Sequence, residues 1–108
     1  MNVRWSERAA IEFADTAAYV ALEFGGQAAV KMRDTINEAV VSISQFPYIG
    51  KSSFTDEETG VEFRELPCRL NSVVYSIYND GIYIVSIWSN RQDRNKLYST
   101  LKEAAKSM

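Results

Sequence analysis

The chain has 108 residues, of which 46% are hydrophobic and 24% charged, and its net charge is −2. This length suits one domain over residues 1–108 with a single core, and a mildly acidic chain gains little general attraction to nucleic acid. Because the chain has no histidine and one cysteine, Cys68, a zinc site of the usual ligands and any Ser-His or Cys-His mechanism are excluded.

The same features favour a cytoplasmic protein with neither a cofactor nor a membrane partner. No apolar run approaches the roughly 18 residues of a membrane span. The first ten residues, MNVRWSERAA, lack the apolar core of a secretory signal. Cys68 has no partner for an internal disulfide, as expected in a reducing compartment.

The first half of the chain predicts a short strand followed by two helices. Residues 2–5 are the strand candidate, and Ser6 is a suitable N-cap. Gly25-Gly26 then separates the helices, and Phe46-Pro47 ends the second. Apolar residues recur at helical spacing in both, namely Ala9, Phe13, Ala17, Val20 and Phe24, then Ala29, Met32, Ile36, Ala39, Val40 and Ile43. This pattern predicts an antiparallel helical hairpin.

The second half predicts strands and a terminal helix. Residues 48–60 read as a polar loop that contains an acidic run at 56–58, and residues 61–66 read as a strand closed by Pro67. Asp93 or Asn95 caps the last helix. Its apolar stripe consists of Leu97, Leu101, Ala104 and Ala105.

Residues 70–89 predict a β-hairpin, because Asp80-Gly81 between apolar runs is a strong turn signal. A two-residue turn at these positions fixes the cross-strand pairs and the two faces of the hairpin. One face would pair Ile77 with Ile84, Tyr75 with Ser86 and Val73 with Trp88; the other would pair Tyr78 with Tyr83, Ser76 with Val85 and Val74 with Ile87.

These elements predict an α+β fold, with an N-terminal strand, an antiparallel helical hairpin on one face of a small antiparallel sheet, and a short C-terminal helix. The sheet would be a three-stranded meander with the first strand at one edge. Because both hairpin faces are apolar, the second face is left for the terminal helix or for another chain. We expect a partner to contact Tyr75, Tyr78 and Trp88, with sheet packing as the alternative role of the two tyrosines.

The order of the predicted elements and several short motifs resemble the RelE/ParE superfamily of bacterial type II toxin–antitoxin modules. The matching motifs span almost the whole chain: Trp5-Ser6, Phe46-Pro47-x-x-Gly50, Arg64-Glu65-Leu66, Val74-Tyr75-x-x-Tyr78 and Ser89-Asn90-Arg91-Gln92. The resemblance implies a small growth-inhibiting toxin that serves in plasmid stabilisation and is neutralised by a cognate antitoxin. It leaves the oligomeric state open.

The superfamily has two main activities, and each implies a different target. RelE-like members bind the ribosome and cleave mRNA as metal-independent endoribonucleases. For that activity the resemblance implies Arg64, Arg91 and Tyr98 as catalytic residues, with Lys51 as a nearby cation. Alternatively, Arg64 pairs with a carboxylate of a neighbouring strand, Arg91 caps the sheet or pairs with Asp93, and Tyr98 packs at the core edge.

ParE-like members inhibit DNA gyrase by protein contact, and this branch fits better. RelE-like enzymes are strongly basic and carry an arginine where this chain reads Asn71-Ser72-Val73. We therefore favour a ParE-like growth inhibitor of gyrase, with a RelE-like enzyme or a degenerate toxin that only binds antitoxin as alternatives.

Overall fold

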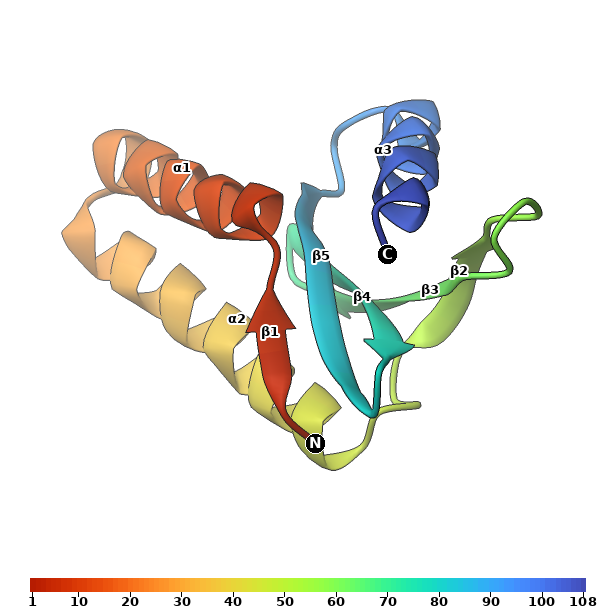
Figure 1. Ribbon diagram of the computed structural model, residues 1–108. Coiled ribbons are helices and arrows are strands. Elements are labelled where there is room, and N and C mark those ends of the chain that lie inside the picture. Colours follow the sequence, from red (N-terminus) through yellow and green to blue (C-terminus); the bar gives the residue numbers. More distant parts are fainter.

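The computed structural model describes residues 1–108 as a sheet lying between two helical layers (Figure 1). The elements in chain order are β1 Val3–Trp5, α1 Glu7–Phe24, α2 Gly26–Gln45, β2 Lys51–Thr55, β3 Glu62–Cys68, β4 Asn71–Tyr78, β5 Gly81–Ser89 and α3 Arg94–Lys106. The five strands lie in the order β1-β5-β4-β3-β2. β1 is parallel to β5, and the other neighbours are antiparallel. The predicted α+β class and element order are confirmed.

The helical hairpin covers one face of the sheet. Ser6 caps α1 as predicted, because its Oγ accepts a hydrogen bond from the amide of Ala9 at 3.0 Å. Most residues of the two predicted apolar stripes belong to the main core with Tyr75 and Ile84, namely Ala9, Phe13, Met32, Ile36, Ala39, Val40 and Ile43. Phe24 is not among them, and 69% of its surface is exposed. It lies at the tip of the hairpin, which extends beyond the sheet (Figure 1).

The opposite face of the sheet is covered by α3, which is the first of the two possibilities that the sequence left open for this face; the other, a partner chain on an uncovered face, does not hold in this structure. Asp93 caps this helix by accepting a hydrogen bond from the amide of Asn95 at 3.0 Å. Leu97, Leu101 and Ala105 then pack over a second cluster that includes Trp88. The helix closes this face because its apolar stripe matches the apolar residues of the sheet beneath it.

The predicted loop at 48–60 contains the strand β2, which the sequence did not reveal. β2 pairs with β3, and its register shifts between Ser52 and Phe54. A short edge strand with polar residues reads as a loop, because half of it faces solvent. β3 also continues through Pro67, which pairs with Ser72 of β4. A proline is tolerated there because the pairing with β2 stops at Glu65.

The turn of the β-hairpin lies one residue earlier than predicted. Tyr78 pairs with Gly81, and the central residues are Asn79 and Asp80, with φ of 50° and 59°. Asparagine and aspartate tolerate this left-handed conformation. Gly81 has a different task, because a Cβ at this position would lie 3.1 Å from the carbonyl oxygen of Asn2 in the neighbouring chain segment.

All six predicted cross-strand pairs were wrong, and so were the faces predicted for Ile87 and Trp88. The register of β4 and β5 shifts between Val74 and Tyr75, so Trp88 lies on the α3 face and Ile87 on the helical-hairpin face. Glu12 of α1 binds this bulge, accepting hydrogen bonds from Ser86 Oγ at 2.8 Å and from the amide of Ile87 at 3.2 Å. Burial raises the pKa of Glu12, and these hydrogen bonds offset only part of that effect.

Candidate protein-interaction surface

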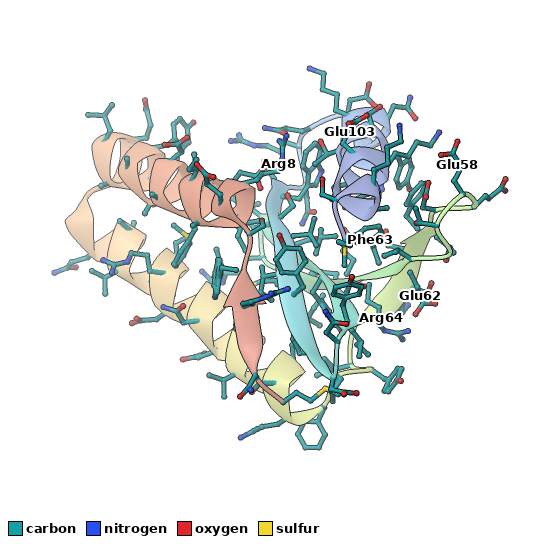
Figure 2. All side chains as sticks on the ribbon, in the orientation of Figure 1. Arg8, Glu58, Glu62, Phe63, Arg64 and Glu103 are labelled. Carbon is teal, nitrogen blue, oxygen red and sulfur yellow. The ribbon has the colours of Figure 1, made fainter.

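The guanidinium group of Arg64 is engaged in holding a neighbouring loop. Its Nε donates to the carbonyl of Gly50 at 2.9 Å, and its Nη1 lies 3.0 Å from the carboxylate of Glu62. The group also stacks over the ring of Tyr48 at 5.1 Å. Figure 2 shows Arg64 beside Glu62 near the sheet edge. Arg64 does pair with a carboxylate, but with one on its own strand and not on a neighbouring one.

Tyr98 packs at the edge of the second core cluster. Its ring stacks on Phe54 of β2, with centroids 5.4 Å apart, and its hydroxyl accepts a hydrogen bond from Arg94 Nε at 3.3 Å. This is the packing role considered as its alternative.

The three predicted catalytic residues do not form one site. Successive side chains of a strand point to opposite faces, and Glu65 contacts α3. Arg64 therefore lies on the helical-hairpin face, whereas Tyr98 lies on the α3 face. Arg91 follows β5, is exposed and forms no ion pair, not even with Asp93.

Arg94 is a cation whose partner the sequence did not reveal. Its Nη2 lies 2.7 Å from Glu65, and its Nη1 donates to the same carboxylate at 3.2 Å. Ser53 donates a third hydrogen bond to Glu65 at 2.8 Å. Burial raises the pKa of Glu65, but the bonds from Arg94 and Ser53 outweigh burial and lower it overall. The hydrogen bond to Glu65 also raises the pKa of Arg94. The sequence did show the cationic cluster after β5, to which Arg94 belongs. It did not show the partner, because Glu65 lies 29 residues earlier in the chain.

The three residues expected to bind a partner differ in their exposure. Tyr75 is fully buried on the helical-hairpin face, and Trp88 is 4% exposed beneath α3. The indole Nε1 of Trp88 has no hydrogen-bond acceptor. Tyr78 is half-buried and borders a shallow pocket with Tyr48. In the isolated chain, Tyr78 thus offers the most accessible surface of the three.

An apolar groove lies at the tip of the helical hairpin, where α1 and α2 meet the β3–β4 turn. Two adjoining cavities of about 220 and 340 Å³ form it and share Val20, Phe24, Leu70 and Asn71. We call this surface the hairpin groove. Its apolar lining comes from Tyr19, Val20, Phe24, Met32, Ile36 and Leu70. Phe24 and Leu70 are 69% and 68% exposed, so large apolar side chains stand in solvent at this site.

Cations without ion-pair partners surround the hairpin groove. Lys31, Arg69 and Arg91 line it, with Asp15 as its one acidic residue. None of these four takes part in the ion pairs of the chain. Arg69 also has φ of 61° at the β3–β4 turn, a conformation that costs a non-glycine residue energy. The turn thus presents Arg69 and Leu70 to the groove at some cost in stability.

Comparison with known proteins identifies the family. The model of the ParE toxins of type II toxin–antitoxin systems, parDE, matches residues 3–94. The chain belongs to this family. It resembles a structure of the chromosomal ParDE toxin–antitoxin system from P. aeruginosa, with a TM-score of 0.68 and 20% identity over 82% of this chain and 95% of that one.

This ParE-family chain also resembles the YoeB-YefM complex from Staphylococcus aureus, at a TM-score of 0.47 and 24% identity over 82% of this chain and 94% of the other. No curated protein matches the chain significantly. Its helices include none long and apolar enough to cross a membrane.

Sequence reasoning missed most of the hairpin groove of this ParE-family chain. Val20 and Phe24 were read as core residues because of their helical spacing, and Met32 both packs on the core and lines the groove. One signal was available: Val20 and Phe24 stand next to the Gly25-Gly26 turn, at the end of the helical hairpin. Leu70 carried no signal, because a single apolar residue in a turn is common.

Proposed function

We propose that this ParE-family chain is the toxin of a type II toxin–antitoxin pair. It inhibits growth by contacting DNA gyrase in the bacterial cytoplasm, and a cognate antitoxin neutralises it by occupying the hairpin groove. The observation that carries the proposal is the groove itself. It combines exposed Phe24 and Leu70 with three unpaired cations on a framework of packed helices and strands.

The chemistry of the groove defines the antitoxin segment that fits it. An amphipathic helix or extended segment would place apolar side chains against Val20, Phe24 and Leu70. Acidic residues of the same segment would face Lys31, Arg69 and Arg91, which have no carboxylate partner in the free chain. Apolar anchors supply most of the affinity, and the charges favour the correct partner and register.

The distribution of cations supports action by protein contact over RNA cleavage. Cleavage needs a base, an acid and cations that converge on one phosphate. Here Arg64 and Arg94 are paired with Glu62 and Glu65. Tyr98 lies on the opposite face from Arg64, so Arg91 is the one predicted catalytic cation that has no ion-pair partner. Cations that do not converge on one point suit recognition of a protein surface better than stabilisation of a pentacovalent phosphate.

The antitoxin site is tested with Phe24→Glu and the co-encoded antitoxin. The carboxylate would be buried in an apolar contact, so we expect the dissociation constant to rise at least tenfold in calorimetry. Val41→Glu is the matched control, because Val41 is an exposed apolar residue of α2 outside the groove, and it should leave binding unchanged. Equal binding by Phe24→Glu and the wild type would refute this placement.

The target is tested by induced expression followed by pulse labelling of DNA and protein synthesis. We expect DNA synthesis to stop first with an SOS response, and purified gyrase to lose supercoiling activity. Early arrest of translation with cut mRNA would support the RelE-like alternative instead. In that case Arg91→Ala should slow cleavage by about 100-fold or more, because a transition-state cation is lost. No growth effect at all would indicate a degenerate toxin.

A further inference from the structure

Helix α1 carries apolar residues on two opposite sides. Ala9 and Phe13 face the sheet. The outer side carries Ile11, Ala14, Ala18 and Leu22, a spacing that aligns them in one stripe. All four are exposed, Ile11 by 51% and Leu22 by 85%. In Figure 1, α1 lies at the upper left of the molecule, and no other element is drawn directly above it. A helix that is apolar on opposite sides is expected to be buried on both.

We propose that this outer stripe is a self-association surface, on which the α1 helices of two copies pack antiparallel. The two large residues of the stripe, Ile11 and Leu22, are symmetric about the point midway between Thr16 and Ala17. Ile11 and Leu22 lie at equal distances from this point, about 8 Å along the axis. Antiparallel packing about a two-fold axis therefore places Ile11 of each copy against Leu22 of the other. The small residues near the centre, Ala14 and Ala18, let the two helices approach closely.

The same register supplies each copy with charges that its own helix ends lack. Helix α2 begins at Gly26, its N-cap residue Gly25 provides no side-chain cap, and its first turn has no acidic residue. Glu7 of the second copy would lie beside it and complement the positive end of that helix. The last turn of α1 has no basic residue but contains Glu23. Arg8 of the second copy would lie beside that negative end.

Arg8 is available for this contact because it forms no ion pair within its own chain. It lies at the end of α1 nearest to α3, as Figure 2 shows. Asp15 is the one charge that would lie near its own counterpart across the axis. Repulsion between the two Asp15 carboxylates weakens the dimer. Removing this charge should therefore strengthen the dimer, which gives a second test of the register. These complementary ends favour a second copy of the chain over an unrelated partner.

The stripe and the hairpin groove lie on different sides of α1, although Asp15 borders both. A helix of 18 residues is about 27 Å long, so a single pair of helices makes a small interface. We therefore expect a weak, concentration-dependent dimer. The inference does not rest on the proposed function, because its tests measure neither growth arrest nor antitoxin binding.

Cysteine cross-linking tests the register directly. Ile11→Cys and Leu22→Cys chains of different tag lengths are mixed and oxidised briefly. We expect the mixed 11–22 disulfide to dominate, because identical positions would lie about 16 Å apart along the axis, beyond the roughly 4.4–6.8 Å between Cα atoms that a disulfide spans. The wild type is the control for the buried Cys68. A statistical mixture of the three products, or none, would overturn the proposal.

Sedimentation equilibrium gives an independent readout, with circular dichroism to confirm that each variant is folded. We expect Leu22→Glu to abolish the dimer and Asp15→Asn to strengthen it several-fold. Val41→Glu, an equally drastic change of an exposed residue on α2, should have no effect. A wild type that stays monomeric at high micromolar concentration would contradict the proposal, as would equal losses in Leu22→Glu and Val41→Glu.

Discussion

The hydroxyl of Tyr75 holds the chain where it leaves α2. It donates to the carbonyl of Pro47 at 2.7 Å and accepts from the amide of Gly50 at 2.9 Å. Arg64 binds the carbonyl of the same glycine from the other side. The buried Tyr75 and the half-buried Arg64 thus satisfy backbone groups of the segment 47–50, which has no regular structure of its own. This internal role accounts for the burial of Tyr75.

Gly50 is the residue at which this packing should be most sensitive. A Cβ at this position would lie 2.7 Å from the Tyr75 hydroxyl and 3.0 Å from the carbonyl oxygen of Glu65. We expect Gly50→Ala to lower the free energy of unfolding by about 1–3 kcal/mol, measured by urea denaturation. The control is Gly26→Ala, where nothing lies within 4 Å. If both variants keep full stability, the close packing around Gly50 is wrong.

At Arg69, a substitution is expected to raise the free energy of unfolding. Its φ of 61° is unfavourable for a residue with a Cβ. We expect Arg69→Gly to raise the free energy of unfolding by about 1 kcal/mol. Arg69→Ala removes the same charge but keeps the Cβ, so it should not share this gain. Both variants should bind the antitoxin more weakly, since both lose a cation of the groove. Equal stabilisation by glycine and alanine would show that charge, and not backbone strain, is responsible.

Among the elements, α3 is joined to the sheet by one ion pair and one apolar stripe. Glu65 of β3 binds Arg94 in the first turn of α3, while Leu97 and Leu101 pack on Trp88 and its neighbours. The side chain of Glu65 is only 10% exposed, so its carboxylate is shielded from water more than that of a surface pair. The pair therefore ties the first turn of α3 to β3.

The ion pair predicts a pH dependence. Because the pKa of Glu65 is lower in the folded chain than its ordinary 4.5, its contribution is complete above pH 4.5 and is lost as the pH falls through the lowered value. We expect Glu65→Gln to cost about 1.5–3 kcal/mol at pH 7, and less in more acidic solution. Glu103→Gln is the control, since its pair with Lys106 is exposed and should contribute little. A pH-independent cost would refute the assignment.

At the scale of the whole molecule, the two sides of the sheet have different roles. The helical hairpin projects past the sheet and exposes the hairpin groove, whereas α3 closes the other side (Figure 1). A partner can therefore use the hairpin side without rearranging the fold. Use of the α3 side would require that helix to move first.

Fluorescence of Trp88 distinguishes these two routes. In a Trp5→Phe chain, Trp88 is the only tryptophan, and it is buried beneath α3. We expect saturating antitoxin to leave its emission maximum and its acrylamide quenching unchanged, because the groove lies elsewhere. A red shift would show that the helix is displaced, which would contradict the proposed placement of the antitoxin.

The local chemistry of the chain was sufficient to predict all of its elements except β2. Helical spacing identified both core stripes, Ser6 identified one helix start, Asp93 or Asn95 marked another, and Asn79 to Gly81 located a turn to within one residue. These features are read from neighbours in the sequence, where period and capping act over a few residues. The order of the elements then indicated the superfamily, which the family match over residues 3–94 confirmed.

Only the tertiary structure decided what each side chain is available to do. The bulge at Val74 and Tyr75 reversed the faces of Trp88 and Ile87, because a one-residue shift turns every later side chain. Glu65 and Arg94 are 29 residues apart, yet their contact removes a cation from any catalytic site. The hairpin groove exists because the helices outreach the sheet. Residues far apart in sequence meet only through the packing of whole elements, which no local pattern encodes.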